Sequence, residues 1–543
     1  MSPAPQPVVV SGLDVRFGTR PVLHDVDLTA QPGRRIGLVG ENGSGKSTLL
    51  RAVAGTLPAR AVVQGSVQRP AEVVMLGQEP PFADHHTVAA VLARTLAPLR
   101  QMVADVERLS GALADEGGDT AYADALDLAV AHDAWDADRR AAEAAERLGL
   151  GALEPGRAIG TLSGGQRTRL ALATIMTTRP GCLLLDEPTN HLDDEAVEQL
   201  TAFLRGLPGV VLLASHDRVL LDDVCTDLFD LDPSALGTDG SGGRRFGGGW
   251  TAYDVHRRAA RRRWEETYEA QQEELGRLRA ATRIGTSAIA HDRPPRDNDR
   301  YYYSFKGGRV DRTLARRKKD AERRLDLAEQ EQVRKPRPPL RLRADLTGTG
   351  AAGRLVQVRD LVVDGRLRVA RLDLDAGRHL LVSGVNGSGK STLLGVLSGR
   401  IPPTSGTVSV TARRVAELVQ DVTFERPGRG ARATYDALVG PQRSAETPLR
   451  DLGLLPASQH ATAVRLLSVG QRRRLGLAVA IASAPDLLLL DEPTNHLSLA
   501  LAGELEEALA TTPGTVVVAT HDRWLRRRWA GDELVLDGLS GSG

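Results

Sequence analysis

Residues 40–47 read GENGSGKS, and residues 384–391 read GVNGSGKS. Each stretch follows a short apolar run, at 35–39 and at 380–383, and opens a segment with helical character. A glycine-rich loop between a buried strand and a helix presents backbone N–H groups that can cradle a phosphate. The sequence therefore predicts two P-loop nucleotide sites in tandem, each in an α/β domain.

The polar side chains of the two loops have separate expected roles. Lys46 and Lys390 are expected to reach the β- and γ-phosphates, and Ser47 and Ser391 to supply a hydroxyl to Mg²⁺. The other loop residues expected to bind ATP are Gly40, Asn42, Gly43, Ser44, Gly45 and Thr48 in the first copy, and Gly384, Asn386, Gly387, Ser388, Gly389 and Thr392 in the second.

A second repeated stretch, DEPTNHL, occupies residues 186–192 and 491–497. Each copy ends a run of leucines, which is typical of a strand buried on both faces of a parallel sheet. Asp186 and Asp491 are therefore placed to hold Mg²⁺. Glu187 and Glu492 come next and could polarise the attacking water. A lone Asp-Glu pair usually lacks a function, but the complete repeat favours a catalytic one.

Residues 162–166, LSGGQ, look like the signature of ATP-binding cassette ATPases, and residues 467–471, LSVGQ, look like a variant of it. The resemblance implies that the signature of each cassette closes over the ATP bound to the other cassette. Two composite sites would then form within one monomeric chain. The signature residues that it implicates in ATP binding are Ser163, Gly164, Gly165 and Gln166 in the first cassette, and Ser468, Gly470 and Gln471 in the second.

The same resemblance assigns roles to residues outside the repeats. Gln78 and Gln420 match the family's Q-loop glutamine, which contacts nucleotide and Mg²⁺. His216 in SHDR and His521 in THDR match its switch histidine near the γ-phosphate. Phe17 matches the aromatic residue that stacks on adenine, whereas the second copy has no aromatic residue between positions 355 and 375.

The two copies differ further, so they are expected to hydrolyse ATP at different rates. Val469 stands where the first signature has Gly164, and Ser498 stands where the first copy has Asp193. Which site is slower does not follow from the residues.

Glycine- and proline-rich stretches near 242–249 and 335–350 mark domain boundaries. We expect a first cassette domain at 1–245, a linker at 246–345 and a second cassette domain at 346–543. The predicted fold class is α/β, with two P-loop ATP-binding cassette domains joined by an α-helical hairpin linker. The first copy has roughly 40 extra residues between P-loop and signature, and the Ala-rich stretch at about 87–148 predicts a short helical arm there.

The linker is predicted to be a pair of antiparallel helices. Trp264, Tyr268, Leu275 and Leu278 share one helical stripe, and Leu314, Ala321, Leu325 and Ala328 share another. Residues 251–340 contain about 23 Lys and Arg against 15 Asp and Glu, roughly +8. Because the whole chain carries +1, positive charge is concentrated in this segment, which suits a phosphate backbone. A solvated helix face explains any single basic run equally well.

The tip of the linker, at about 285–309, interleaves aromatic and cationic residues. Bases or sugars can stack on such rings, and RNA is often recognised in this way. A protein contact stays open as an alternative. The residues expected to contact RNA or the ribosome are Arg293, Arg296, Arg300, Tyr301, Tyr302, Tyr303, Phe305, Lys306 and Arg309.

Tandem cassettes, PTNHL after both glutamates, and FGGGW at 246–250 followed by Tyr253 resemble the ABC-F class of translation factors. The resemblance implies an ATPase that uses ATP and Mg²⁺ and binds the ribosome through the linker, near large-subunit RNA and P-site tRNA. The long aromatic tip resembles the branch that confers antibiotic resistance by displacing a drug from the large subunit. A housekeeping translation factor shares every ATP motif and is the first alternative.

The composition bears on the other function classes. Two cysteines, Cys182 and Cys225, make a zinc or iron–sulfur site improbable, and a DNA-repair ATPase of this family would need zinc cysteines or a long inserted coil. No run approaches the roughly 18 apolar residues that span a bilayer, so we expect a cytoplasmic protein without a stable membrane partner. The ATPase subunit of a drug exporter is the second alternative, although such a subunit has no evident use for a basic hairpin.

Overall fold

The computed structural model describes residues 6–40, 43–77, 80, 82–111, 118–190, 192–231, 242–283, 316, 318–336, 353–385, 387–495, 497 and 499–536. The chain divides into two compact units. The first comprises Met1–Asp232, Ser241–Tyr253 and Pro338–Gly543, and the second comprises Pro233–Gly240 and Asp254–Arg337.

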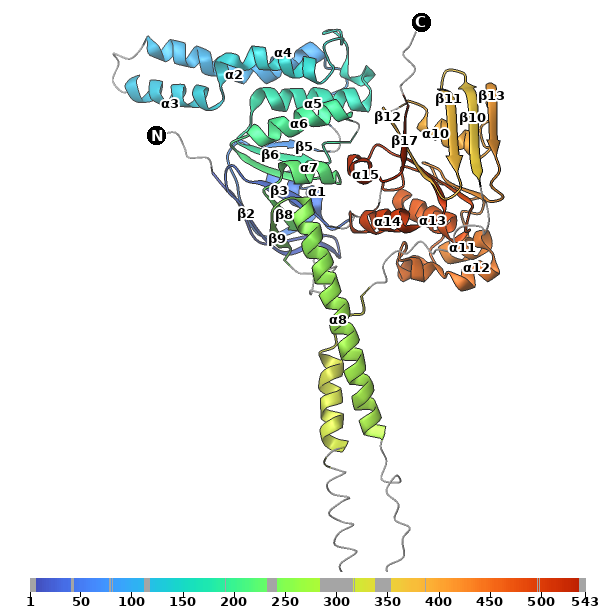
Figure 1. Cartoon of the computed structure of the whole chain (residues 1–543). Coiled ribbons are helices and arrows are strands. Elements are labelled where there is room, and N and C mark those ends of the chain that lie inside the picture. The colour runs from blue at the N-terminus through green and yellow to red at the C-terminus, as the bar shows by residue number, and fades with distance from the viewer. Residues whose placement is uncertain are drawn as a thin grey trace, which may run out of the picture. The chain divides into compact units, whose positions relative to one another are not determined.

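The first motif set lies on a six-stranded sheet with the order β5-β6-β7-β3-β8-β9 (Figure 1). Every strand pair in it is parallel except β8 with β9. All residues of β6 and β7 are buried, as expected for apolar strands covered on both faces. The strands are β3 Arg35–Val39, β5 Val74–Leu76, β6 Cys182–Asp186, β7 Val210–Ala214, β8 Asp227–Asp230 and β9 Arg244–Gly247.

The second motif set lies on a five-stranded, all-parallel sheet with the order β14-β15-β16-β12-β17. The central strands repeat the first sheet, because β15, β16 and β12 match β6, β7 and β3 in order and motif. The predicted α/β class is thus confirmed. The strands are β12 His379–Gly384, β14 Val415–Leu418, β15 Leu487–Asp491, β16 Thr515–Ala519 and β17 Asp532–Leu536.

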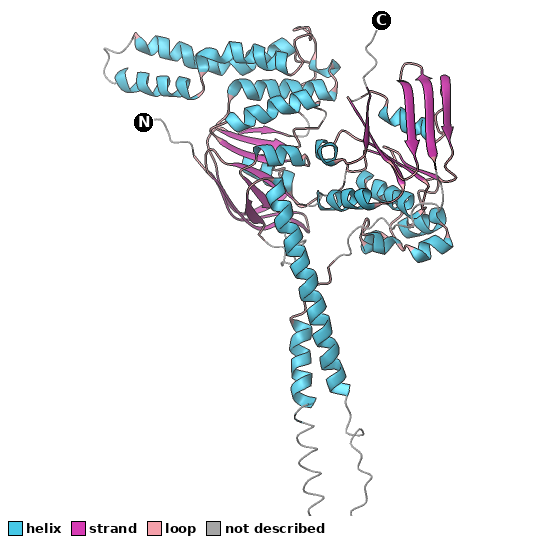
Figure 2. Cartoon of the chain, in the orientation of Figure 1, coloured by secondary structure: helices cyan, strands magenta, loops and turns pink. Residues whose placement is uncertain are grey.

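Each cassette also has a three-stranded antiparallel sheet, with the orders β2-β1-β4 and β11-β10-β13. Figure 2 shows these strands in magenta beside the parallel sheets and their helices. In the first cassette, Val15 and Leu23 of this sheet share a core with Leu38 and Leu49, which flank the P-loop. The strands are β1 Val8–Phe17, β2 Arg20–Ala30, β4 Ala61–Gln68, β10 Arg354–Val363, β11 Leu367–Asp375 and β13 Ser405–Val410.

Helices cover the sheets and carry the remaining motifs. The first cassette has α1 Lys46–Ala54, α5 Gly164–Thr178, α6 Asp194–Gly206 and α7 Arg218–Val224. The second has α10 Lys390–Leu397, α11 Ala431–Val439, α12 Pro441–Glu446, α13 Val469–Ala482, α14 Leu499–Thr511 and α15 Arg523–Arg528.

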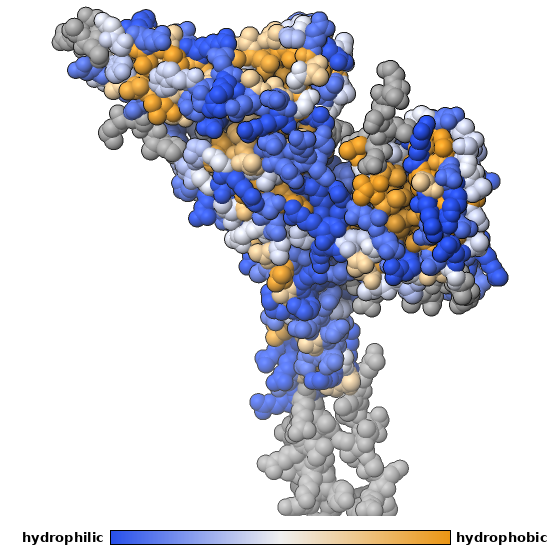
Figure 3. Space-filling view, turned by 45° about the horizontal axis from the view of Figure 1, so that its top comes forward, coloured by the Kyte–Doolittle hydropathy of each residue, from blue (hydrophilic) through white to orange (hydrophobic). Residues whose placement is uncertain are grey.

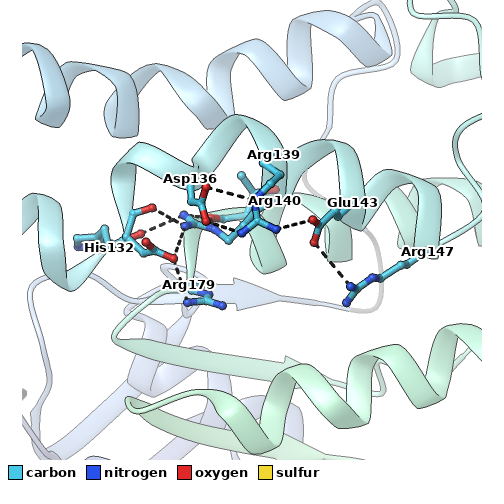
Figure 4. A network of polar contacts seen from close by, with 9 residues as sticks. His132, Asp136, Arg139, Arg140, Glu143, Arg147 and Arg179 are labelled. Carbon is cyan, nitrogen blue, oxygen red and sulfur yellow. Dashed lines mark hydrogen bonds and ion pairs between the residues drawn. The ribbon is translucent and has the colours of Figure 1, made fainter.

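The extra sequence of the first cassette forms helices α2 Val88–Ser110, α3 Gly118–Ala131 and α4 Ala137–Arg147. They share a small core of their own that includes Leu99 and Ala129. Buried Arg140 of α4 ties this group to α5, because its guanidinium donates to the carbonyl of Thr177 at 2.9 Å. Within the group it pairs with Asp133 at 2.9 Å and donates to the carbonyl of His132 at 3.0 Å. Figure 4 shows Arg140 and His132 in this polar network. Burial lowers the pKa of Arg140.

The second unit contains most of α8 Trp250–Arg283 and a helical segment at 318–330. Trp264 donates its indole N–H to the carbonyl of Arg334 at 2.8 Å, and Arg279 pairs with Glu329 at 2.9 Å, so the two segments run antiparallel. Their surface is mostly hydrophilic (Figure 3).

The predicted apolar stripes of the linker face inward. Leu275 is buried, and Trp264, Tyr268 and Leu278 are less exposed than their neighbours on α8. Ala321, Leu325 and Ala328 are likewise the less exposed positions of the partner helix, while Leu314 lies outside the described residues.

In the part of the chain that the structure describes, no helix is both long enough and apolar enough to cross a bilayer.

We predict that Arg140→Met loosens α4. Removing the guanidinium leaves the Thr177 carbonyl without its donor, which should lower the free energy of local opening by about 1–3 kcal/mol. Hydrogen exchange of the amides in α2 to α4 measures this quantity. Arg147→Met is the control, because Arg147 is exposed and lies 3.6 Å from its partner Glu143, so its loss should cost about 0–1 kcal/mol. Equal exchange in the two variants would contradict the proposed anchor.

Candidate functional site

The two P-loops depend on glycines with left-handed backbone. Gly45 and Gly389 cap α1 and α10 with φ of 103° and 96°. A Cβ on Gly45 would lie 2.5 Å from Leu23, and one on Gly389 would lie 2.5 Å from the carbonyl oxygen of Arg366. A side chain at either position would displace the loop from its neighbour, which is strand β2 in the first cassette and the β10–β11 turn in the second. Glycine therefore allows this close approach and leaves the first N–H groups of the helix available to an anion.

The side chain of each P-loop lysine folds back and contacts the start of its own loop. Lys46 Nζ donates to the carbonyl of Gly40 at 3.0 Å, and Lys390 Nζ donates to the carbonyl of Gly384 at 2.8 Å. Both side chains are buried, and burial lowers the pKa of Lys390. The ammonium groups are thus held inside the concave face of each loop, where a phosphate would lie.

The aspartates at the ends of β6 and β15 have the properties of Mg²⁺ ligands. Ser47 donates its hydroxyl to Asp186 Oδ1 at 3.0 Å. The other oxygen of Asp186 and Oδ1 of Asp491 are buried and have no hydrogen-bond partner among the described residues. Burial raises the pKa of Asp491. A carboxylate oxygen left unpaired beside a P-loop hydroxyl fits a hard cation with oxygen ligands.

The two glutamates after these aspartates have unusual backbone geometry. Glu187 has a φ of 53° and Glu492 a φ of 50°, in the left-handed region that non-glycine residues seldom adopt. Each residue still donates its N–H to the neighbouring strand at 2.8 Å, to Ala214 and to Ala519. The turn therefore directs each carboxylate toward the segment that follows β7 or β16.

The first glutamate is largely but not fully buried beside His216, the first predicted switch histidine. Glu187 Oε2 accepts the backbone N–H of His216 at 3.1 Å, and Oε1 lies 3.4 Å from His216 Nε2. Burial raises the pKa of Glu187 to about 7. A carboxyl that titrates near neutrality suits a general base.

The second glutamate is held more closely. Glu492 Oε1 lies 2.7 Å from Nδ1 of His521, and Oε2 accepts the hydroxyl of Thr520 at 3.0 Å. The hydrogen bond to Glu492 raises the pKa of His521. Ser215 occupies the matching position in the first cassette. The hydroxyls of Ser215 and Thr520 both accept the N–H two residues on, from Asp217 and Asp522, at 3.0 Å, so the bond from Thr520 to Glu492 is the feature that differs.

A cavity of about 280 Å³ lies over the second P-loop. Nine of the residues predicted for the second site line it together, namely Gly387, Gly389, Lys390, Ser391, Thr392, Gln420, Asp491, Glu492 and His521. Arg366 and Asn495 also line it and were not singled out from the sequence. Asn495 belongs to the DEPTNHL repeat, which could have identified it. No motif marks Arg366, which lies in the β10–β11 turn.

The signature residues begin α5 and α13 in the same way. Ser163 and Ser468 accept the N–H groups of Gln166 and Gln471, whose side chains accept back from the serine N–H groups. A Cβ on Gly164 would meet nothing within 4 Å, so the valine at position 469 is sterically tolerated. Its side chain is 54% exposed.

Several predicted site residues lie outside the described residues. These are Asn42, Gln78 and Asn386 of the ATP sites, Ser498 after the second repeat, and Arg293, Arg296, Arg300, Tyr301, Tyr302, Tyr303, Phe305, Lys306 and Arg309 of the linker tip. Phe17 is described. It is partly buried at the end of β1 and packs against the core of the first cassette.

Comparison with known proteins agrees with this duplicated geometry. A family model described as ABC transporter matches residues 23–190 and again residues 367–495, which together make up more than half of the chain. The chain belongs to the ABC family of ATPases. It therefore hydrolyses ATP, and it stands close to the tandem-cassette ABC-F members of that family.

Three curated relatives match nearly the whole chain. The tylosin resistance ATP-binding protein TlrC of Streptomyces fradiae is 37% identical over 98% of this chain and 98% of its own length. The energy-dependent translational throttle protein EttA of Mycobacterium tuberculosis is 32% identical over 95% of this chain and 90% of its own length. The probable ATP-binding protein YheS of Escherichia coli is 30% identical over 97% and 78%.

Solved structures with the same fold include an RNase-L inhibitor, with a TM-score of 0.55 and 18% identity over 95% of this chain and 85% of that chain. An archaeal ribosome recycling factor, aABCE1, solved with a ribosomal stalk protein, has a TM-score of 0.54 and 18% identity over the same shares. These similarities confirm a two-cassette fold.

We predict a pH dependence of ATP turnover that reports on Glu187. In the Glu492→Gln variant the first site carries the turnover, and the base form of Glu187 accumulates as the pH rises through about 7. The rate should therefore increase roughly tenfold between pH 6 and pH 8. Steady-state phosphate release measures it, with the Glu187→Gln/Glu492→Gln double variant as the background. A flat profile over this range would contradict the role of Glu187 as the base.

Proposed function

We propose that this chain is an ABC-F ATPase that binds the ribosome and confers resistance to an antibiotic of the large subunit. The similarity to a tylosin resistance protein, which extends over 98% of both chains, carries the proposal. The similarity includes the linker region, so it is not limited to the ATP motifs that every member of the family shares.

ATP hydrolysis would follow from the residues of each site. The P-loop N–H groups and Lys46 or Lys390 would hold the phosphates, and Ser47 with Asp186, or Ser391 with Asp491, would hold Mg²⁺. When bound, Mg²⁺ supplies charge neutralisation for the phosphates. Glu187 and Glu492 would accept a proton from the attacking water.

The linker would make the contact with the ribosome. Residues 251–340 carry roughly +8, and the described helices leave most of their cationic side chains at the surface. Such a segment is attracted to phosphate backbones. The aromatic and basic tip residues would then contact RNA or tRNA, with closure of the cassettes on ATP setting the bound state and hydrolysis releasing it.

A translation factor without a role in resistance is the second candidate. The similarity to the translational throttle protein EttA, at 32% identity over 95% of the chain, favours it. Both candidates bind the ribosome, so drug susceptibility separates them. The exporter ATPase is disfavoured, because the basic helix pair has no evident role in transport.

We predict that expression in a susceptible host raises the minimal inhibitory concentration of tylosin at least fourfold. The Glu187→Gln/Glu492→Gln double variant is the matched control and should give no protection. Replacing Tyr301, Tyr302 and Tyr303 by Ala should reduce protection while leaving ATP turnover intact. If no drug of the large subunit becomes less potent, the translation-factor candidate gains.

We further predict that the Glu187→Gln/Glu492→Gln double variant sediments with ribosomes in ATP, because slow hydrolysis should hold the bound state. High salt should release it, since contacts with phosphate weaken as counterions compete. Quantifying the protein in the ribosomal pellet measures both effects. If the variant stays in the supernatant at low salt, ribosome binding is wrong and the exporter alternative returns.

A further inference from the structure

A buried arginine of the second cassette lies against the catalytic strand and belongs to none of the nucleotide motifs. Arg473 is in the second turn of α13, the helix that begins after Ser468 of the signature. Arg473 is 4% exposed. A cation this far from water is retained in a folded protein when it is well hydrogen-bonded, so its acceptors are informative.

The acceptors of Arg473 are the backbone carbonyls of the two acidic residues at the end of β15. Its Nη2 donates to the carbonyl of Glu492 at 2.8 Å and also to the carbonyl of Asp491. A single nitrogen of the guanidinium thus contacts the carbonyls on both sides of the Cα of Glu492, the predicted base. Charge-assisted hydrogen bonds of this kind are stronger than neutral ones.

Arg473 acts on a strained residue, because Glu492 has a left-handed backbone with a φ of 50°. The side chain of Glu492 is fixed separately by Thr520 and His521. With Arg473 on the carbonyls, the residue is held both at its backbone and at its carboxylate.

The first cassette has no arginine at this place. The matching residue is Thr168, whose hydroxyl donates to the carbonyl of Gly164 in its own helix at 3.1 Å. The second site therefore has a backbone restraint, from an arginine of the helix after the signature, that the first site lacks.

We propose that Arg473 is a positioning residue for ATP hydrolysis at the second site, acting through the Asp491–Glu492 peptide to hold the Glu492 carboxylate at the attacking water. The proposal rests on the assignment of Glu492 as a base and is independent of ribosome binding. Loss of Arg473 would let the peptide relax and would move the carboxylate, and a small misplacement of a catalytic group costs much of the rate.

The test uses the full-length protein without ribosomes and compares Glu492→Gln, Arg473→Thr and the Arg473→Thr/Glu492→Gln double variant. Arg473→Thr installs the residue of the first cassette. We expect it to lower kcat to about the level of Glu492→Gln while KM for MgATP changes less than twofold. The double variant should lose no more than Glu492→Gln alone, because a residue that acts through Glu492 has nothing left to position.

Two further variants separate positioning from a structural role. Arg432→Thr is the control, since Arg432 is exposed on α11, outside the nucleotide motifs, and lies 3.6 Å from Asp436 of the same helix, and it should keep the kcat of the wild type. Arg473→Lys retains one donor and should recover part of the kcat. If Arg473→Thr fails to fold, the kcat of Arg473→Lys decides, with a value between wild type and Glu492→Gln expected.

Each of three results would overturn the proposal: losses that multiply in the double variant, a rise in KM with unchanged kcat, or equal rates for Arg473→Thr and Arg432→Thr. A failure of the assignment of Glu492 is distinguishable, because Glu492→Gln itself would then retain full turnover. A failure of the ribosome proposal leaves all of these rates unaffected.

Discussion

The backbone pairing at the ends of β6 and β15 is the constraint on which both sites depend. Asp186 and Asp491 are the last paired residues of their strands, opposite Ala214 and Ala519. The next residue keeps one more hydrogen bond to the same alanine and at that point enters the left-handed region. This places successive carboxylates in different directions. The aspartate stays beside the P-loop hydroxyl, whereas the glutamate reaches the histidine two residues beyond the alanine. A strained turn at a functional site persists because surrounding contacts determine it.

The sequence was sufficient for the parts of the site that lie within short, complete motifs. Lys46, Ser47 and Asp186 could be assigned because a P-loop and a buried strand fix their backbone positions relative to each other. Residues that reach the site from elsewhere could not be found in this way. Arg473 contacts a strand 18 residues further along the chain, and Arg140 contacts a helix 37 residues away. Such contacts depend on tertiary packing, for which an arginine in a helix gives no periodic or spacing signal.

The two copies also differ at residues that the sequence comparison did not single out. Val469 in place of Gly164 leaves the capping of α13 intact, because a Cβ at the glycine position meets only open space. Asp193 caps α6 and pairs with Arg169 at 2.8 Å, so it serves local helix structure. Two differences affect a contact of a predicted catalytic glutamate: Thr520 stands in place of Ser215, and Arg473 in place of Thr168. A hydroxyl that binds the carboxylate and a cation that binds its backbone make the second glutamate the more restrained of the two.

The helix pair of the linker shows how a basic segment can keep a defined register with little apolar contact. Leu275 is buried, but most described positions of both helices are exposed. Hydrogen bonds from Gln271 add to the few apolar contacts, because its side chain accepts the N–H of Val333 at 2.8 Å and donates to the carbonyl of Glu331 at 3.3 Å. Together with the hydrogen bond from Trp264 to Arg334, these contacts join side chains of α8 to the backbone of residues 331–334, which follow the second helix. A slip of one residue would break all of them at once, so the register does not require the cations. Under the proposed function, the cationic side chains would contact a phosphate surface while the uncharged contacts keep the register of the two helices.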